Sequence, residues 1–162
     1  MVIRALTCLL LLVLCCGPAT ACFGPKLYIG VPAGRSTDLL YALVSLYVQE
    51  KTGVESLRVD LGPDVDPLSE LDADRLDLVL VASDSDKDND HPGTIMSLAG
   101  YPAVVAGERP LEELQFTTVV PAVRKLATLV TTQDLAVLLG RMNEGASAMA
   151  EVRNLMMERR WI

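Results

Sequence analysis

Strand-like and helix-like segments alternate through the first half of the chain, and this order constrains the fold more than any other feature of the sequence. Residues 26–31 form a short β-rich run, and residues 36–53 carry apolar side chains at helical spacing. A second strand-like run, 56–61, and a short helix through Leu68 and Leu71 then lead to residues 76–82 (LDLVLVA). A near-continuous apolar run of this kind is typical of a central parallel strand buried on both faces. The order β-α-β-α-β therefore predicts a sheet with helices packed on its faces.

Turn and cap signals divide these segments. Pro32-Ala33-Gly34 separates the first strand from its helix, Gly53 ends that helix, and Asp66-Pro67 is typical of an N-cap followed by proline. Asp38 lies in the first turn of the expected helix, and either Ser36 or Thr37 is a candidate cap.

The second half predicts further regular structure and ends in adjacent helices. Thr131 and Asp134 have the spacing of a capping box, Gly145 marks the end of the helix that follows, and Ser147 is a candidate cap for the last helix. The expected elements are a strand within 102–106, a polar turn or short helix at 108–113, a strand at 116–120 and a helix at 121–130. The fold expected from the whole pattern is α/β: a three-layer parallel or mixed sheet with flanking helices in a single domain, residues 22–162.

Residues 1–21 have the features of an export signal and are excluded from the fold. Arg4 supplies the positive charge, residues 5–16 form an apolar run, and residues 17–21 are a small-residue cleavage region. The next residue, Cys22, follows Ala19-Thr20-Ala21 in a pattern similar to a bacterial lipobox, so Cys22 is the predicted lipidation site. The remaining cysteines all lie in the signal, which leaves no intrachain disulfide. The alternative is an ordinary cut after Ala21 that leaves Cys22 unmodified. In either case the protein is exported, and acylation would place it on a periplasmic or cell-surface membrane.

The charge of the chain argues against several kinds of partner. The formal charge is −7, and it becomes −8 when Arg4 leaves with the signal. An acidic chain without a basic stripe is a poor ligand for nucleic acid and for an anionic lipid surface.

An acidic stretch interrupts the alternation, and we expect an acidic linker loop at 83–93. Its alternating carboxylates suggest a weak calcium loop as an alternative to a solvated linker. The match to a calcium-binding EF-hand loop fails because Asn89 stands where glycine is needed and Ile95 where glutamate is needed. His91 precedes Pro92-Gly93 and is interpreted as a turn residue. The calcium candidates are Asp84, Asp86, Asp88 and Asp90; no other metal site and no cofactor is predicted.

The loop after the first strand is the candidate ligand-binding site. It comprises Ala33, Gly34, Arg35, Ser36 and Thr37, at the N-terminal end of the first helix. Backbone N–H groups and the positive end of a helix favour an anionic or carboxylate group there. The alternative is that Ser36 and Thr37 only cap the helix.

Several of these segments together resemble a known protein family. The matching pieces, in order, are KLYIG at 26–30, EKTG at 50–53, LRVDL at 57–61, DRLDLVLV at 74–81 and the long segment 119–162, in which TTQDLAVLLG stands where the family has a related helix opening. They resemble type 2 periplasmic substrate-binding proteins of the glycine betaine, choline and osmoprotectant class, which serve ABC transporters.

The resemblance implies a solute-binding protein that has lost one of its two lobes. Such proteins clamp a ligand between two α/β lobes, and this chain is much shorter, with the missing part falling at the acidic stretch. The expected function is therefore an exported lipoprotein with one solute-binding lobe, which binds a small solute or assists an ABC-type uptake system. The family uses aromatic residues to hold quaternary ammonium ligands, but those of this chain are scattered along the sequence.

Two other functions are alternatives to this one. The lobe could be an interaction or scaffold module that uses the former inter-lobe face to contact a permease, another partner or a second copy. An enzyme ranks last, because no nucleophile and base pair, metal-ligand spacing or phosphate loop is present, and no catalytic residue is predicted.

Overall fold

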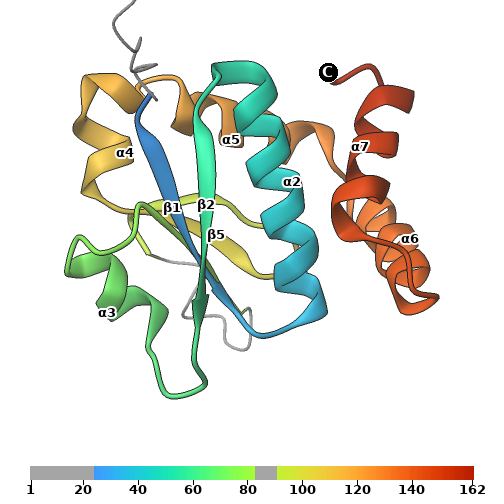
Figure 1. Cartoon of the computed structure of the whole chain (residues 1–162), viewed down its shortest axis with the longest axis horizontal. Helices are drawn as coiled ribbons and strands as arrows, with labels where there is room; N and C mark the ends of the chain where they lie inside the picture. Colours follow the sequence, from blue (N-terminus) through green and yellow to red (C-terminus); the bar gives the residue numbers. More distant parts are fainter. Residues whose placement is uncertain (1–23, 83–90) are drawn as a thin grey trace, which may run out of the picture.

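The computed structural model describes residues 24–82 and 91–162, which form one mixed sheet with helices on both faces (Figure 1). The strands are β1 (Lys26–Pro32), β2 (Glu55–Leu61), β3 (Leu78–Val81), β4 (Thr94–Met96) and β5 (Ala103–Ala106). The helices are α2 (Arg35–Thr52), α3 (Pro67–Asp72), α4 (Glu108–Glu112), α5 (Val119–Leu129), α6 (Thr132–Asn143) and α7 (Ala148–Glu158), with a 3₁₀ turn, η2 (Leu114–Phe116). The predicted export signal, Cys22 and the calcium candidates Asp84, Asp86, Asp88 and Asp90 lie outside the described residues.

The sheet has the strand order β2-β1-β3-β5-β4. Strands β2 and β3 both pair with β1 in parallel, which confirms the parallel core expected from the alternation. Strand β5 runs antiparallel to β3, and β4 runs antiparallel to β5. The α/β prediction is therefore confirmed in its mixed form. The short strand β4 was not anticipated, since it is only 3 residues long.

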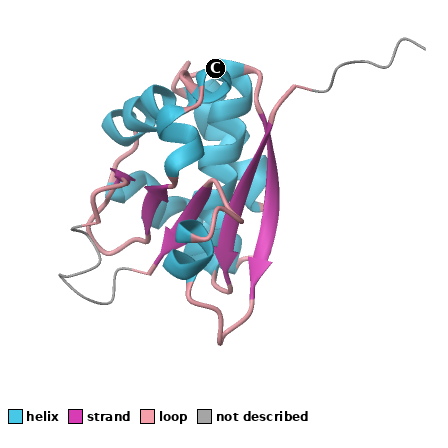
Figure 2. Ribbon diagram, turned by 90° about the vertical axis from the view of Figure 1, so that its left-hand side faces the viewer, coloured by secondary structure: helices cyan, strands magenta, loops and turns pink. Residues whose placement is uncertain are grey.

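Most of the core lies between one face of the sheet and the long helices. Helix α2 packs on this face beside α5, and α6 and α7 lie outside them (Figure 1). Leu39, Leu43, Phe116 and Leu135 are fully buried in this cluster. A smaller apolar cluster, including Leu71 and Val79, lies on the opposite face beneath α3. Figure 2 looks onto the face of the sheet, with its strands spread across the view and the long helices behind them.

The strand predicted at 116–120 is wrong. Residues 114–116 form η2, and helix α5 begins at Val119. Phe116, Val119, Val120 and Val123 are all buried, and this spacing places them on one side of a helix. The β-branched residues suggested a strand locally, but burial of this helical stripe against the core outweighs that preference.

The helix ends follow the predicted signals with one exception. Gly53 is the left-handed C-cap of α2, with φ of 73° and its N–H donating to the carbonyl of Gln49. Asp66 caps α3 ahead of Pro67, and Thr131 forms the capping box of α6 with Asp134. Ser147 occupies the N-cap position of α7 without a side-chain hydrogen bond to the helix. The exception is α2, whose N-cap is Gly34 rather than Ser36 or Thr37.

Candidate functional site

The predicted ligand loop lies at the carboxyl end of β1, beside the end of β3. Strands β1 and β3 are neighbours inside the sheet. The chain leaves β1 toward β2 on one side and leaves β3 toward β4 and β5 on the other. Connections that diverge in this way create a crevice at the carboxyl ends of the two parallel strands. Open α/β sheets bind their ligands in such crevices, so the fold places the loop where a ligand is expected.

A surface hollow of ≈ 260 Å³ lies at this position. It is lined by all of the predicted residues, Ala33, Gly34, Arg35, Ser36 and Thr37, together with Ala82, Gly100, Tyr101 and Pro102. The structure therefore brings the predicted loop together with the ends of two other segments. These additional residues were missed. Ala82 ends a predicted strand, but residues 100–102 come before the strand predicted at 102–106 and reach this edge only because β5 runs antiparallel to β3.

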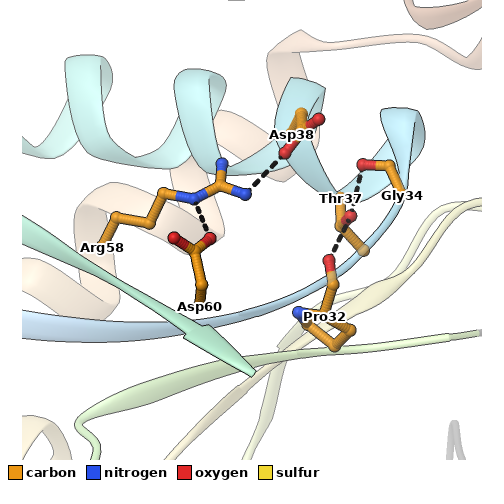
Figure 3. A network of polar contacts seen from close by, with 6 residues as sticks. All are labelled: Pro32, Gly34, Thr37, Asp38, Arg58 and Asp60. Carbon is orange, nitrogen blue, oxygen red and sulfur yellow. Dashed lines mark hydrogen bonds and ion pairs between the residues drawn. The ribbon is translucent and has the colours of Figure 1, made fainter. Parts of the chain in front are cut away.

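Thr37 holds the loop in shape rather than facing a ligand. Its Oγ1 lies 2.7 Å from the carbonyl oxygen of Pro32 and 2.6 Å from that of Gly34, and the side chain is buried (Figure 3). The hydroxyl has one proton, so it donates to one of these carbonyls at a time. Thr37 thus ties the end of β1 to the start of α2.

Arg35 is likewise held by protein groups. Its Nη1 donates to the carbonyl oxygen of Met142 at 2.8 Å and to Oδ1 of Asn143 at 2.9 Å. Both acceptors are in the last turn of α6, where unpaired carbonyls favour a cation. The guanidinium of Arg35 therefore joins the ligand loop to α6.

The first turn of α2 leaves backbone donors for a ligand. The N–H groups at the start of a helix have no partner inside it, and no side chain caps α2. Ser36 is only half-buried, and in the part of the chain that the structure describes its hydroxyl makes no hydrogen bond. The hollow thus offers N–H donors of Arg35, Ser36 and Thr37 and one hydroxyl.

The electrostatics of the hollow differ from those of the rest of the surface. Among the described residues, none that lines it is Asp or Glu, although the chain carries a formal charge of −7. Four other hollows of the described surface each include at least one carboxylate. The arrangement therefore favours an anionic group over a cation.

A neighbouring cluster neutralises the acid in the first turn of α2. Arg58 Nη2 lies 2.7 Å from Asp38 Oδ1, and Arg58 Nε lies 2.5 Å from Asp60 Oδ1 (Figure 3). Its guanidinium also lies over the Tyr41 ring, 5.4 Å from the centroid. Burial, the largest single effect, lowers the pKa of Arg58, but the hydrogen bonds and charges of Asp60 and Asp38 raise it overall. The carboxylate of Asp38, next to the hollow, is thus paired with the guanidinium of Arg58.

Asp77 is a buried ionisable residue that the sequence interpretation passed over. Its Oδ2 accepts a hydrogen bond from the Tyr28 N–H at 2.7 Å, and its Oδ1 forms an ion pair with Arg109 Nη1 at 2.9 Å. Burial is the main reason why the pKa of Asp77 is raised. The residue joins β1, the start of β3 and α4 at the end of the sheet away from the hollow, so its role is in packing.

The aromatic side chains do not form a cage in the described residues. Only Tyr101 lines the hollow. Tyr41, Tyr47 and Phe116 lie beneath Arg58, Lys51 and Arg109, respectively, and Trp161 is buried in the core. Tyr28 is partly exposed on β1. The arrangement offers no enclosed site for a quaternary ammonium group.

His91 is confirmed as a turn residue, because its Nδ1 accepts a hydrogen bond from the Gly93 N–H at 3.1 Å. Within residues 24–82 and 91–162, no cluster of His, Cys, Asp and Glu is arranged to hold a metal ion. The described helices also include none that is long and apolar enough to cross a membrane.

Comparison with models of known families, with curated proteins and with solved structures found no match to this chain.

Proposed function

We propose that the chain is a single solute-binding lobe that acts outside the cytoplasm in an ABC-type uptake system. The hollow at the carboxyl ends of β1 and β3 holds the carboxylate of a small solute. The observation that carries this proposal is that the loop 33–37 lines a hollow at the crevice of the sheet, and that no Asp or Glu of residues 24–82 and 91–162 lines it.

The size and donor set of the hollow define the class of solute. Its volume of ≈ 260 Å³ is below the usual range for ligand pockets, which begins at about 300 Å³, so only a small solute fits. Backbone N–H groups of α2 and the Ser36 hydroxyl donate to the carboxylate, and Tyr101 provides an apolar wall. A zwitterion of amino-acid size, with its cationic end toward solvent, fits these features.

Export and acylation complete the proposal. The signal at residues 1–21 directs the protein out of the cytoplasm, and an acylated Cys22 anchors it to a membrane. Only a few residues separate Cys22 from β1, so the lobe stays close to the membrane that carries a permease. Mass analysis of the processed N-terminus tests this step, since a free Cys22 thiol contradicts it.

Binding is tested by thermal shift and calorimetry with acetate, glycine betaine, proline and glycine. A ligand that binds only the native state raises its stability, so at least one of these solutes should raise Tm. The informative variant is Ser36→Asp, with Ser36→Asn as its neutral control. A carboxylate in the first turn favours the helix but repels an anionic ligand. We expect Ser36→Asp to keep its stability while affinity falls by tenfold or more (about 1.4 kcal/mol), and Ser36→Asn to bind within a few-fold of wild type.

The hydrogen bonds that hold the loop 33–37 favour a second function, contact with a partner protein. Thr37 and Arg35 are both occupied by protein carbonyls, and the described residues contain a single lobe around one sheet. A solute in this hollow would remain partly exposed. The alternative is an interaction module whose crevice edge contacts a partner or a second copy. Absence of a thermal shift with every solute, together with a concentration-dependent dimer in sedimentation, would support this alternative and reject solute binding.

A further inference from the structure

A second surface lies at the opposite end of the sheet from the solute hollow. Helices α3 and α4 border a groove of ≈ 340 Å³ there. Its lining includes the end of β5, and β5 runs antiparallel to β3, so the groove lies at the amino end of β3. In Figure 1, α4 at the upper left and α3 at the lower left both lie along the edge of the molecule away from α6 and α7. We call this surface the α3–α4 groove, and its principal residues are Leu71, Asp72, Asp74, Glu108, Leu111 and Glu112.

The groove has an apolar floor and an exposed apolar side chain. Leu71 and Ala106 are buried beneath it, and Pro92 contributes to its wall. Leu111 on α4 remains 48% exposed, although leucine usually loses more of its surface in a folded domain. The side chain is thus available to contact an apolar group of a partner.

The rim of the groove carries several carboxylates. In the described part of the chain, no ion pair reaches Asp72, Asp74, Glu108 or Glu112. Arg75 follows Asp74 directly in the sequence, but its Nε lies 2.6 Å from Glu70 Oε2. Arg109 follows Glu108, and it lies 2.9 Å from buried Asp77 and 3.7 Å from Glu113. The charges of both arginines are therefore already matched.

Elsewhere on the described surface, carboxylates are more often paired with a cation. Most of those on the sheet and the long helices are paired with Lys or Arg, namely Asp38 and Asp60 with Arg58, Glu55 with Lys26, Asp134 with Arg159 and Glu151 with Arg141. Unpaired carboxylates gathered around an apolar floor repel one another. A cationic partner removes this repulsion, and an apolar partner side chain covers Leu111.

We infer that the α3–α4 groove binds a basic amphipathic segment of a partner protein. Lysine or arginine side chains of the segment pair with the rim carboxylates, and an apolar side chain packs on Leu111 and the floor. This surface is separate from the solute hollow, so a partner and a solute can bind at the same time.

The test uses the purified protein and a fluorescein-labelled peptide of twelve residues with lysine and leucine at helical spacing. Anisotropy is measured at about 0.15 M salt, where distant surface charges are largely screened. We expect saturable binding, and the double variant Glu108→Gln/Glu112→Gln should weaken it by about three- to tenfold. Leu111→Ser should also weaken binding, because it removes the apolar contact.

The matched control is Glu50→Gln/Glu144→Gln, which changes the net charge equally at exposed, unpaired sites outside the groove. This variant should bind the peptide as wild type does. Equal weakening by both double variants would mean bulk attraction to an acidic protein and would overturn the inference. Equal binding of a peptide with glutamate in place of lysine would overturn it as well.

A second copy of the chain could occupy the α3–α4 groove in place of a separate partner, and this alternative is tested by self-association. In sedimentation velocity without peptide, the wild type and the Glu108→Gln/Glu112→Gln variant should have the same oligomeric state. Self-association that the Glu108→Gln/Glu112→Gln variant abolishes would assign the groove to a second copy and would overturn the inference of a separate partner.

Discussion

At the scale of single residues, Asp77 shows how burial and pairing oppose each other. The carboxylate is removed from solvent but keeps the Tyr28 N–H and the Arg109 guanidinium as partners. Burial has the largest effect and raises its pKa, while the Tyr28 hydrogen bond and the Arg109 charge lower it. The folded protein therefore holds the Asp77 proton more tightly than the unfolded chain does.

This direction sets a pH dependence of stability. An acid with a raised pKa contributes most stability below its unfolded pKa of about 3.9, and this contribution is lost as pH rises through the folded pKa. The variant Asp77→Asn lacks the titrating group. We expect the unfolding free energy of wild type minus that of Asp77→Asn to fall between pH 3.5 and pH 7, as measured by urea unfolding. A difference that grows with pH would show that the Arg109 ion pair outweighs burial.

At the scale of elements, helix ends are set by residues within one turn. Gly53 ends α2 in the left-handed region, whereas Gly140 lies in the exposed interior of α6. A Cβ added to either glycine meets no atom within 4 Å, so neither substitution causes a clash. The two positions therefore differ in backbone conformation alone.

Alanine at these two positions should have opposite effects. Gly53→Ala forces a left-handed alanine and should lower the unfolding free energy by about 1 kcal/mol. Gly140→Ala should raise it by about 0.5–1 kcal/mol, because alanine loses less backbone entropy in a helix. Parallel chemical denaturation of both variants checks this, and a loss of stability in Gly140→Ala would contradict the assignment of that segment as a regular helix.

At the scale of the whole molecule, Arg35 connects the solute loop with the pair of helices α6 and α7. These helices pack on α2 through buried side chains such as Leu138, Val152 and Met156. The hydrogen bonds from Arg35 to Met142 and Asn143 add a polar link at the crevice end of the sheet. Two hydrogen bonds therefore fasten the loop to the last turn of α6.

Removing this link should loosen the end of α6. Arg35→Ala should lower the unfolding free energy by about 1 kcal/mol and reduce hydrogen-exchange protection in the last turn of α6. Arg153→Ala is the matched control, since Arg153 is exposed on α7 and makes no ion pair in the described residues. Unchanged protection near Met142 in Arg35→Ala would show that packing alone positions α6.

The sequence determined the features that act over a few residues. The alternation of strands and helices, the Gly53, Asp66 and Thr131 caps, and the placement of the loop 33–37 at a strand end all follow from local spacing and backbone chemistry. Only the tertiary structure decided the direction of β5, the helical state of residues 119–120 and the partners of Asp77 and Arg35. The physical reason is separation along the chain: Tyr28 meets Asp77 across 49 residues and Arg35 meets Met142 across 107. Such contacts depend on how the sheet and helices pack, which no local pattern encodes.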